Sequence, residues 1–138
     1  MPMTPEELDA FLAPPRMAHF ATVDGDGCPR IRPVWYLWRD GALWMTTRRR
    51  VRHTGRDLAS NPRVAVSIAS EDRPYRAVVI HGRPEVRPKD RDLLLEVSTR
   101  YGDEQGHRFT DEALAQDDRV MLKLVPDELI SWDYGTSS

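Results

Sequence analysis

Arginine side chains are concentrated in one short stretch of the 138-residue chain, between Arg48 and Arg56. Five of the nine residues in this arginine-rich stretch are arginine, and His53 lies among them, although the chain as a whole has a formal net charge of −2. Guanidinium groups form paired hydrogen bonds with phosphate oxygens, and free backbone N–H groups at the beginning of a helix bind the same oxygens. The stretch therefore predicts a site for a phosphate group.

Hydroxyl side chains lie beside the arginines and strengthen this prediction. Thr46 and Thr47 precede the stretch and Thr54 lies within it, and hydroxyl groups are neutral donors that suit phosphate oxygens. Gly55 allows close backbone packing in the first turn of a helix. A solvated helix face bearing several arginines is the alternative interpretation, and the residue types alone leave both open.

Arg32 lies inside a run of bulky strand-forming residues that extends from Arg30 to Trp38. Alternation along a single strand would put Arg30, Arg32, Val34, Tyr36 and Trp38 on one face and Ile31, Pro33, Trp35 and Leu37 on the other. An arginine among apolar neighbours requires an anionic partner or a route to solvent. The phosphate or ribityl chain of a cofactor would supply a partner for Arg32.

The elements that must position these residues are mostly strands. Apolar runs bounded by turn residues predict six strands, over residues 17–23, 30–38, 42–47, 63–68, 77–82 and 120–125. The turn sequences at 24–27 and 40–41 join the first three into an antiparallel meander. Residues 129–134 are expected to continue in an extended conformation.

Helices are predicted at the margins of these strands. Thr4 and Glu7 form a capping box for a first helix, and the arginine-rich stretch leads into a second, short one. Spaced apolar residues over 88–101, with Asp90 at the start, predict a third. The polar residues 103–118 are expected to hold one more short helical turn. Together these elements predict a mainly β barrel with flanking helices.

Length and composition exclude several classes of protein. A chain with 40% hydrophobic and 30% charged residues fits one globular domain over 1–138, outside the disordered and membrane classes. A net charge of −2 and the lack of a recognised motif argue against nucleic acid and membranes as partners. The four histidines have no metal-ligand spacing, so no metal is expected. The single cysteine, Cys28, and the lack of a leader sequence predict a cytoplasmic location.

Several segments of the chain form a longer pattern. FATVDGDGCPRIRPVWY at 20–36 is followed by GALWMTT at 41–47, RDLASNPRVA at 56–65, VIHGRPEV at 79–86 and a closing strand at 120–132. In order and spacing this pattern resembles the pyridoxamine 5'-phosphate oxidase-like split barrels, in their flavin- and deazaflavin-dependent oxidoreductase branch. The resemblance extends over residues 6–134 and is weakest between 98 and 118.

The resemblance implies a six-stranded antiparallel split barrel that forms a homodimer, with FMN or the deazaflavin coenzyme F-420 bound at the subunit interface. Position by position, Arg32, Val34 and Trp35 would line the ring. Thr46 and Thr47 would contact the ribityl chain or the phosphate, and the phosphate itself would be bound by Arg52, His53, Thr54 and Arg56. Trp132 of the other subunit would cover the ring. Relatives commonly have a lysine in this turn where the chain has Thr54.

The same resemblance implies an oxidoreductase that moves a hydride between the cofactor and a small organic substrate. No residue stands out as a proton donor, so a non-catalytic carrier or sensor of FMN or F-420 is the alternative. The long anionic tail of F-420 needs an extended basic groove. Arg48, Arg49 and Arg50 would provide one, so F-420 is favoured over FMN.

Overall fold

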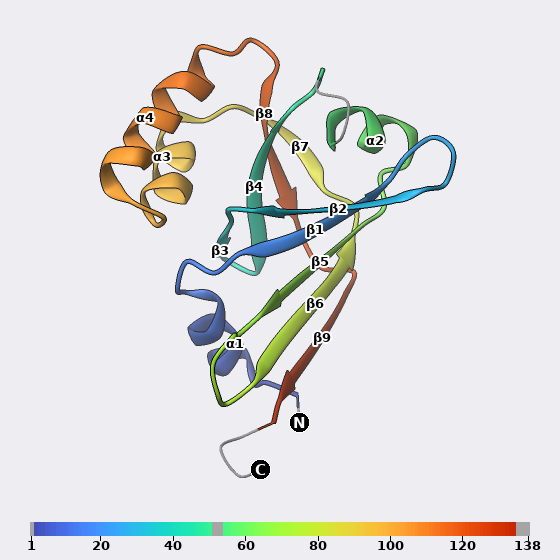
Figure 1. Ribbon diagram of the computed structural model, residues 1–138, viewed down its shortest axis with the longest axis vertical. Coiled ribbons are helices and arrows are strands. Elements are labelled where there is room, and N and C mark those ends of the chain that lie inside the picture. Colours follow the sequence, from blue (N-terminus) through green and yellow to red (C-terminus); the bar gives the residue numbers. More distant parts are fainter. Residues whose placement is uncertain (1, 51–53, 135–138) are drawn as a thin grey trace.

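Two antiparallel sheets with flanking helices make up the computed structural model, which describes residues 2–50 and 54–134 (Figure 1). The strands in these ranges are β1 (Ala18–Val23), β2 (Pro29–Val34), β3 (Leu37–Arg39), β4 (Ala42–Arg48), β5 (Val64–Ala69), β6 (Arg76–Gly82), β7 (Glu85–Pro88), β8 (Arg119–Leu124) and β9 (Glu128–Asp133). The helices are α1 (Pro5–Leu12), α2 (Thr54–Ser60), α3 (Arg91–Thr99) and α4 (Asp103–Leu114). None of these helices is long and apolar enough to span a membrane.

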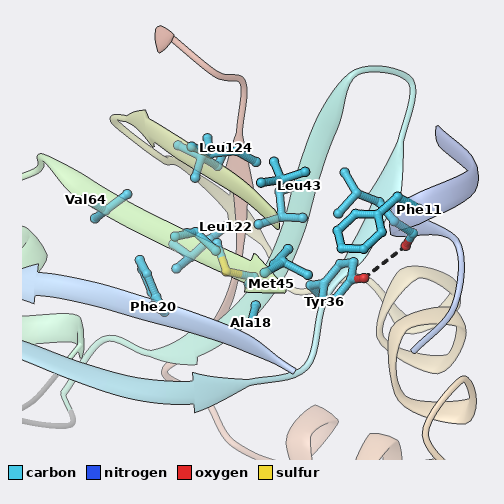
Figure 2. Packing of buried hydrophobic residues seen from close by; sticks show 14 residues of the cluster. Phe11, Ala18, Phe20, Tyr36, Leu43, Met45, Val64, Leu122 and Leu124 are labelled. Carbon is cyan, nitrogen blue, oxygen red and sulfur yellow. Dashed lines mark hydrogen bonds between the residues drawn. The ribbon is translucent and has the colours of Figure 1, made fainter. Parts of the chain in front are cut away.

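The strands form a five-stranded sheet in the order β2-β1-β5-β6-β9 and a four-stranded sheet in the order β3-β4-β8-β7. The main apolar core takes side chains from both sheets (Figure 2). Phe20 and Val64 come from the five-stranded sheet and Leu43 and Leu122 from the four-stranded sheet, and all four are buried. The predicted mainly β architecture with helices at its margins is therefore confirmed.

The prediction of a single strand over residues 30–38 is wrong. The chain crosses from one sheet to the other inside this segment. β2 pairs with β1, whereas β3 pairs with β4 in the other sheet. Tyr36, at the crossing, is fully buried, and its hydroxyl group donates to the carbonyl oxygen of Leu12 at 3.0 Å (Figure 2). Arg100, which follows α3, donates to the carbonyl oxygen of Tyr36. These contacts hold the crossing in place, and the predicted three-stranded meander does not form.

The described ranges contain more strands than the six predicted. Division of the strand over 30–38 adds one, and β7 adds another beside β8. The extended segment predicted at 129–134 is the edge strand β9, which pairs with β6. The additional strands lie at edges of the two sheets, where short runs of polar and apolar residues carry little signal in the sequence.

Local capping signals position the helices as predicted. Thr4 accepts a hydrogen bond from the backbone N–H of Glu7 at 3.2 Å, and the Glu7 carboxylate accepts one from the backbone N–H of Thr4 at 2.9 Å. Asp90 accepts a hydrogen bond from the backbone N–H of Leu93 at 3.1 Å at the start of α3. α2 begins within the arginine-rich stretch, at Thr54, so the stretch leads into a short helix as expected.

α4 is a full helix, not the single helical turn predicted for residues 103–118. With α3 it lies beside β4 and β8 (Figure 1), over a second apolar cluster that includes Leu94 and Met121. Glycine lowers helix propensity, yet Gly106 is required here, because a Cβ at this position would overlap the backbone at the end of α3. The packing of two helices thus determines an element that local sequence does not reveal.

Candidate functional site

A cavity of about 380 Å³ lies where the chain leaves β2, a volume within the range of roughly 300–1,000 Å³ typical of small-ligand pockets. Val34 and Trp35 line it from the end of β2, and Thr46 lines it from β4. The structure therefore brings three of the predicted site residues together. The other lining residues are Met17, Pro33, Val97, Ser98, Phe109 and Arg119.

Trp35 is held between two other aromatic rings. Its indole is stacked on the ring of Tyr101, and it meets Phe109 edge-on at a centroid distance of 5.4 Å. Burial raises the pKa of Tyr101 to about 12, so its phenol keeps its proton in moderately alkaline solution as well. Trp35 therefore offers the cavity an aromatic wall in a defined orientation.

Thr46 and Thr47 lie on opposite faces of β4, because side chains alternate along a strand. The hydroxyl group of Thr46 donates to the carbonyl oxygen of Val120 at 2.7 Å, and the side chain lines the cavity beside α3 and α4. Thr47 lines a smaller cavity of about 140 Å³, together with Gly55 and Leu58 of α2. The two threonines therefore cannot contact one part of a ligand from the same side.

Arg32 has an anionic partner inside the chain. Its Nη2 atom donates to the hydroxyl group of Thr22 at 2.9 Å, and that hydroxyl donates to Oδ2 of Asp57 at 2.8 Å. Asp57 lies in α2 and is 2% exposed, with Oδ2 3.9 Å from Nη2 of Arg32. Burial lowers the pKa of Arg32, and the Asp57 charge acts against that shift. The Nη1 atom of Arg32 is buried and has no hydrogen-bond partner among the described residues.

Two aspartates before β8 neutralise part of the arginine-rich stretch. Nε of Arg48 donates to Oδ1 of Asp118 at 2.9 Å, and the guanidinium of Arg50 lies 3.2 Å from the Asp117 carboxylate. Burial opposes ionisation of Asp118, but hydrogen bonds from the Arg48 side chain and the Arg50 backbone hold the pKa of Asp118 below its usual value. Arg48 and Arg50 are therefore less available to an external anion than their positions in the sequence suggest.

The other predicted phosphate ligands fall into two groups. Arg56 is exposed. Arg49, another arginine of the same stretch, is exposed as well, and neither of the two forms an ion pair within residues 2–50 and 54–134. Arg52 and His53 lie outside the described residues. Arg49 and Arg56 are thus the described members of the stretch whose charge is not matched by a carboxylate.

The beginning of α2 packs closely against the backbone of the arginine-rich stretch. Thr54 is 7% exposed. A Cβ at Gly55 would overlap the carbonyl oxygens of Arg48 and Arg49, so only glycine permits this approach. The contact fixes the start of α2 beside the end of β4.

Trp132 does not join the other predicted residues within one chain. It lies on β9, at the edge of the five-stranded sheet opposite β2, and pairs with Ala77 of β6. Three strands separate β9 from β2, which corresponds to about 19 Å at the usual spacing of about 4.8 Å between strands. A contact between Trp132 and a ring beside Trp35 within one chain would have to span this width of the sheet.

Three cavity residues had no signal in the sequence. Ser98, Phe109 and Arg119 come from α3, α4 and β8, in or next to the segment where the family pattern is weakest. Their positions depend on the packing of α3 and α4 against the four-stranded sheet. Among the described residues, no carboxylate or imidazole lines the cavity, and no group of three His, Cys, Asp or Glu side chains could hold a metal ion.

Known structures share this architecture. Rv2991, a conserved hypothetical protein from Mycobacterium tuberculosis, is 24% identical, with 95% of this chain and 85% of the other covered and a TM-score of 0.79. An F-420 reductase is 27% identical, with 91% of this chain and 98% of the other covered and a TM-score of 0.71. HutZ, a haem storage protein from Vibrio cholerae, is 20% identical, with 100% of each chain covered and a TM-score of 0.71. A comparison with curated proteins gives no match.

The sequence itself matches a family model. The model described as pyridoxamine 5'-phosphate oxidase covers residues 4–133, which include both sheets, all four described helices and the cavity. The two antiparallel sheets with flanking helices agree with the split barrel expected from the resemblance. The chain therefore belongs to the pyridoxamine 5'-phosphate oxidase family.

Proposed function

We propose that the chain is an oxidoreductase that binds F-420 or FMN and moves a hydride between this cofactor and a small organic substrate. The observation that carries the proposal is the cavity at the end of β2, because Val34, Trp35 and Thr46 line it together. The family and the similarity to an F-420 reductase support it. The bound ring would supply the hydride chemistry, while the chain binds and orients the ring and excludes water.

In this proposal the cofactor extends from the cavity towards the arginine-rich stretch. Val34 and Trp35 contact the ring, and Thr46 contacts the ribityl chain. Arg32 contributes its unpaired Nη1 donor. Because Thr47 lies on the other face of β4, with α2, it belongs with the phosphate ligands. Those ligands are Arg52, His53, Thr54 and Arg56.

A homodimer completes the proposed site, since Trp132 reaches the ring only from a second copy. The outer face of the five-stranded sheet supports this association. It carries Ile31 on β2 and Ile130 on β9, which are 69% and 39% exposed, and burial of such apolar side chains against a partner is favourable. Light scattering should give twice the chain mass of 15.9 kDa. A mass of one chain would remove Trp132 from the proposed site.

F-420 is the favoured cofactor, because the exposed charge of Arg49 suits its long anionic tail. The pairing of Arg48 and Arg50 with aspartates makes this support weaker than the sequence alone indicates. Isothermal titration calorimetry with each cofactor tests the choice. We expect F-420 to bind more tightly than FMN. If FMN instead binds more tightly by about tenfold, or about 1.4 kcal/mol, FMN becomes the favoured cofactor.

A non-catalytic carrier or sensor of the same cofactor is the second candidate. It is favoured by the cavity lining, which includes no described carboxylate or imidazole that could move a proton. Steady-state assays with reduced F-420 or reduced FMN and a panel of conjugated acceptors separate the two functions. Turnover above the rate without protein supports the oxidoreductase, and tight binding of the cofactor without turnover supports the carrier.

A further inference from the structure

The cavity at the end of β2 has a side, formed by α3, α4 and the first residue of β8, that the family pattern does not explain, and we call it the helical side. Ser98, Phe109 and Arg119 form this side. We propose that it binds the substrate, that the substrate is a planar aromatic carboxylate, and that Arg119 contacts the carboxylate. The inference rests on the proposed function, because it places the substrate beside the cofactor ring at Trp35.

Arg119 carries a charge that no carboxylate of the described residues pairs with. Its Nε and Nη2 atoms donate to Oε1 of Gln116 at 3.0 and 2.6 Å, and this amide oxygen is neutral. The adjacent carboxylate, Asp118, is directed instead at Arg48, 2.9 Å from its Nε. Burial and the nearby Arg48 charge lower the pKa of Arg119, and the Asp118 charge acts against that shift. A ligand carboxylate in the cavity would therefore meet a cation that has no ion-pair partner among the described residues.

An aromatic ring holds this cation beside the cavity. The guanidinium of Arg119 lies over Phe109, 5.4 Å from the ring centroid, a cation–π contact that restricts its position. Phe109 in turn meets Trp35 at an interplanar angle of 65°. The remaining walls are mostly apolar and include Val34 and Val97. A flat conjugated body with one anionic end matches such a lining, because a second charge would lie against apolar walls without a partner.

Ser98 is among the residues that line the same side of the cavity. It is fully buried, and its hydroxyl has no hydrogen-bond partner within the described part of the chain. A serine or threonine in a helix can donate to the carbonyl oxygen four residues earlier. Thr99, the next residue, forms this hydrogen bond to Leu95 at 2.7 Å, whereas Ser98 does not. Since an unpaired buried hydroxyl is costly, we assign Ser98 as a donor to the substrate carboxylate.

Two ligands of similar shape and different charge test the proposal on the full chain without cofactor. 2-Naphthoate carries a carboxylate on a flat ring system, and 2-naphthalenemethanol carries a hydroxyl group in its place. By NMR titration we expect the naphthoate to bind more tightly by about tenfold, the scale of one charge-assisted hydrogen bond. Arg119→Gln should abolish this preference and keep the affinity for the alcohol, which also shows that the variant is folded.

Arg108→Gln is the matched control, because Arg108 is an exposed arginine of α4 that does not line the cavity. It should leave both affinities unchanged. Ser98→Ala should weaken naphthoate binding alone. No naphthoate binding, equal affinity for the two ligands, or an unchanged preference in Arg119→Gln would overturn the proposal. Displacement of naphthoate by saturating F-420 or FMN would also overturn it, because the cofactor would then occupy the helical side itself.

These outcomes are separable from those of the proposed function. Naphthoate binding is measured without cofactor, so its failure leaves the cofactor titrations unaffected. A retained preference for naphthoate in a protein that binds neither cofactor would contradict the proposed function and leave Arg119 as the recognition residue for an aromatic carboxylate.

Discussion

The hydroxyl group of Tyr101 donates a hydrogen bond to the carbonyl oxygen of Arg16 at 2.6 Å. The same hydroxyl accepts a hydrogen bond from the backbone N–H of Tyr36 at 3.1 Å. The ring of Tyr101 is stacked on Trp35, with centroids 5.0 Å apart and an interplanar angle of 8°. One side chain therefore connects the segment before β1, the crossing between the sheets and the aromatic wall of the cavity.

Removal of the Tyr101 hydroxyl should destabilise the fold. Tyr101→Phe keeps the ring stacked on Trp35 but leaves the Tyr36 N–H and the Arg16 carbonyl oxygen without this partner, which should lower the free energy of unfolding by about 1–3 kcal/mol. Tyr75→Phe is the control, because Tyr75 is 50% exposed, and its effect should stay within about 0.5 kcal/mol. Urea unfolding followed by circular dichroism measures both. Equal loss in the two variants would contradict the role given to Tyr101.

Stability should fall in strongly alkaline solution because of the same residue. Burial raises the pKa of Tyr101 from 10.0 to about 12, and burial also raises the pKa of Tyr36. Between these pH values the unfolded chain loses phenol protons that the folded chain keeps, so the free energy of unfolding decreases as pH rises. The contribution is fully present below pH 10.0 and is lost as pH rises through about 12. Urea unfolding across this window should show a steeper decrease for the native chain than for Tyr101→Phe, and parallel curves would contradict the pKa assignment.

Gly55→Ala should damage the phosphate end of the proposed site. Its Cβ would overlap the carbonyl oxygens of Arg48 and Arg49, and overpacking of this kind costs about 1–3 kcal/mol of stability. Displacement of α2 should also weaken cofactor binding. Gly25→Ala is the control, since a Cβ at Gly25 would lie 3.6 Å from Oγ of Ser60, an ordinary contact. Thermal unfolding and cofactor titration of the two variants make the comparison, and similar behaviour of both would show that α2 is free to shift.

Arg52→Ala should weaken cofactor binding by about 1–3 kcal/mol, the scale for loss of a charge-assisted hydrogen bond. Arg50→Ala removes an arginine from the same stretch, but the Arg50 guanidinium lies against Asp117, so its effect on affinity should be smaller. Calorimetric titration of both variants measures the difference. An unchanged affinity in Arg52→Ala would mean that the phosphate contacts are assigned at the wrong positions.

The sequence predicts those elements whose signals are local. The capping box of Thr4 and Glu7 and the cap at Asp90 are confirmed, because each depends on residues three positions apart. The turn before β2 is also where it was expected, with Gly27 at a positive φ of 83°. Such features require no knowledge of distant parts of the chain.

The features that the sequence misses depend on contacts between distant segments. The break after β2 follows from the burial of Tyr36 against Leu12, 24 residues away. The arginine-rich stretch loses part of its free charge to Asp117 and Asp118, which follow Arg50 by 67 and 68 residues. The chain itself supplies the anionic partner that the sequence predicts for Arg32, which is Asp57 of α2. Residue types indicate that a partner is needed, and only the fold identifies it.

The central claim is that the chain binds a flavin or deazaflavin, and the anisotropy of the cofactor's own fluorescence tests it most directly. A small cofactor tumbles rapidly when free and slowly when bound to a 15.9 kDa chain or its dimer. We predict a saturable rise in anisotropy when the purified protein is added to F-420 or FMN, weakened in Arg52→Ala. Anisotropy that stays at the free value for both cofactors would contradict the account.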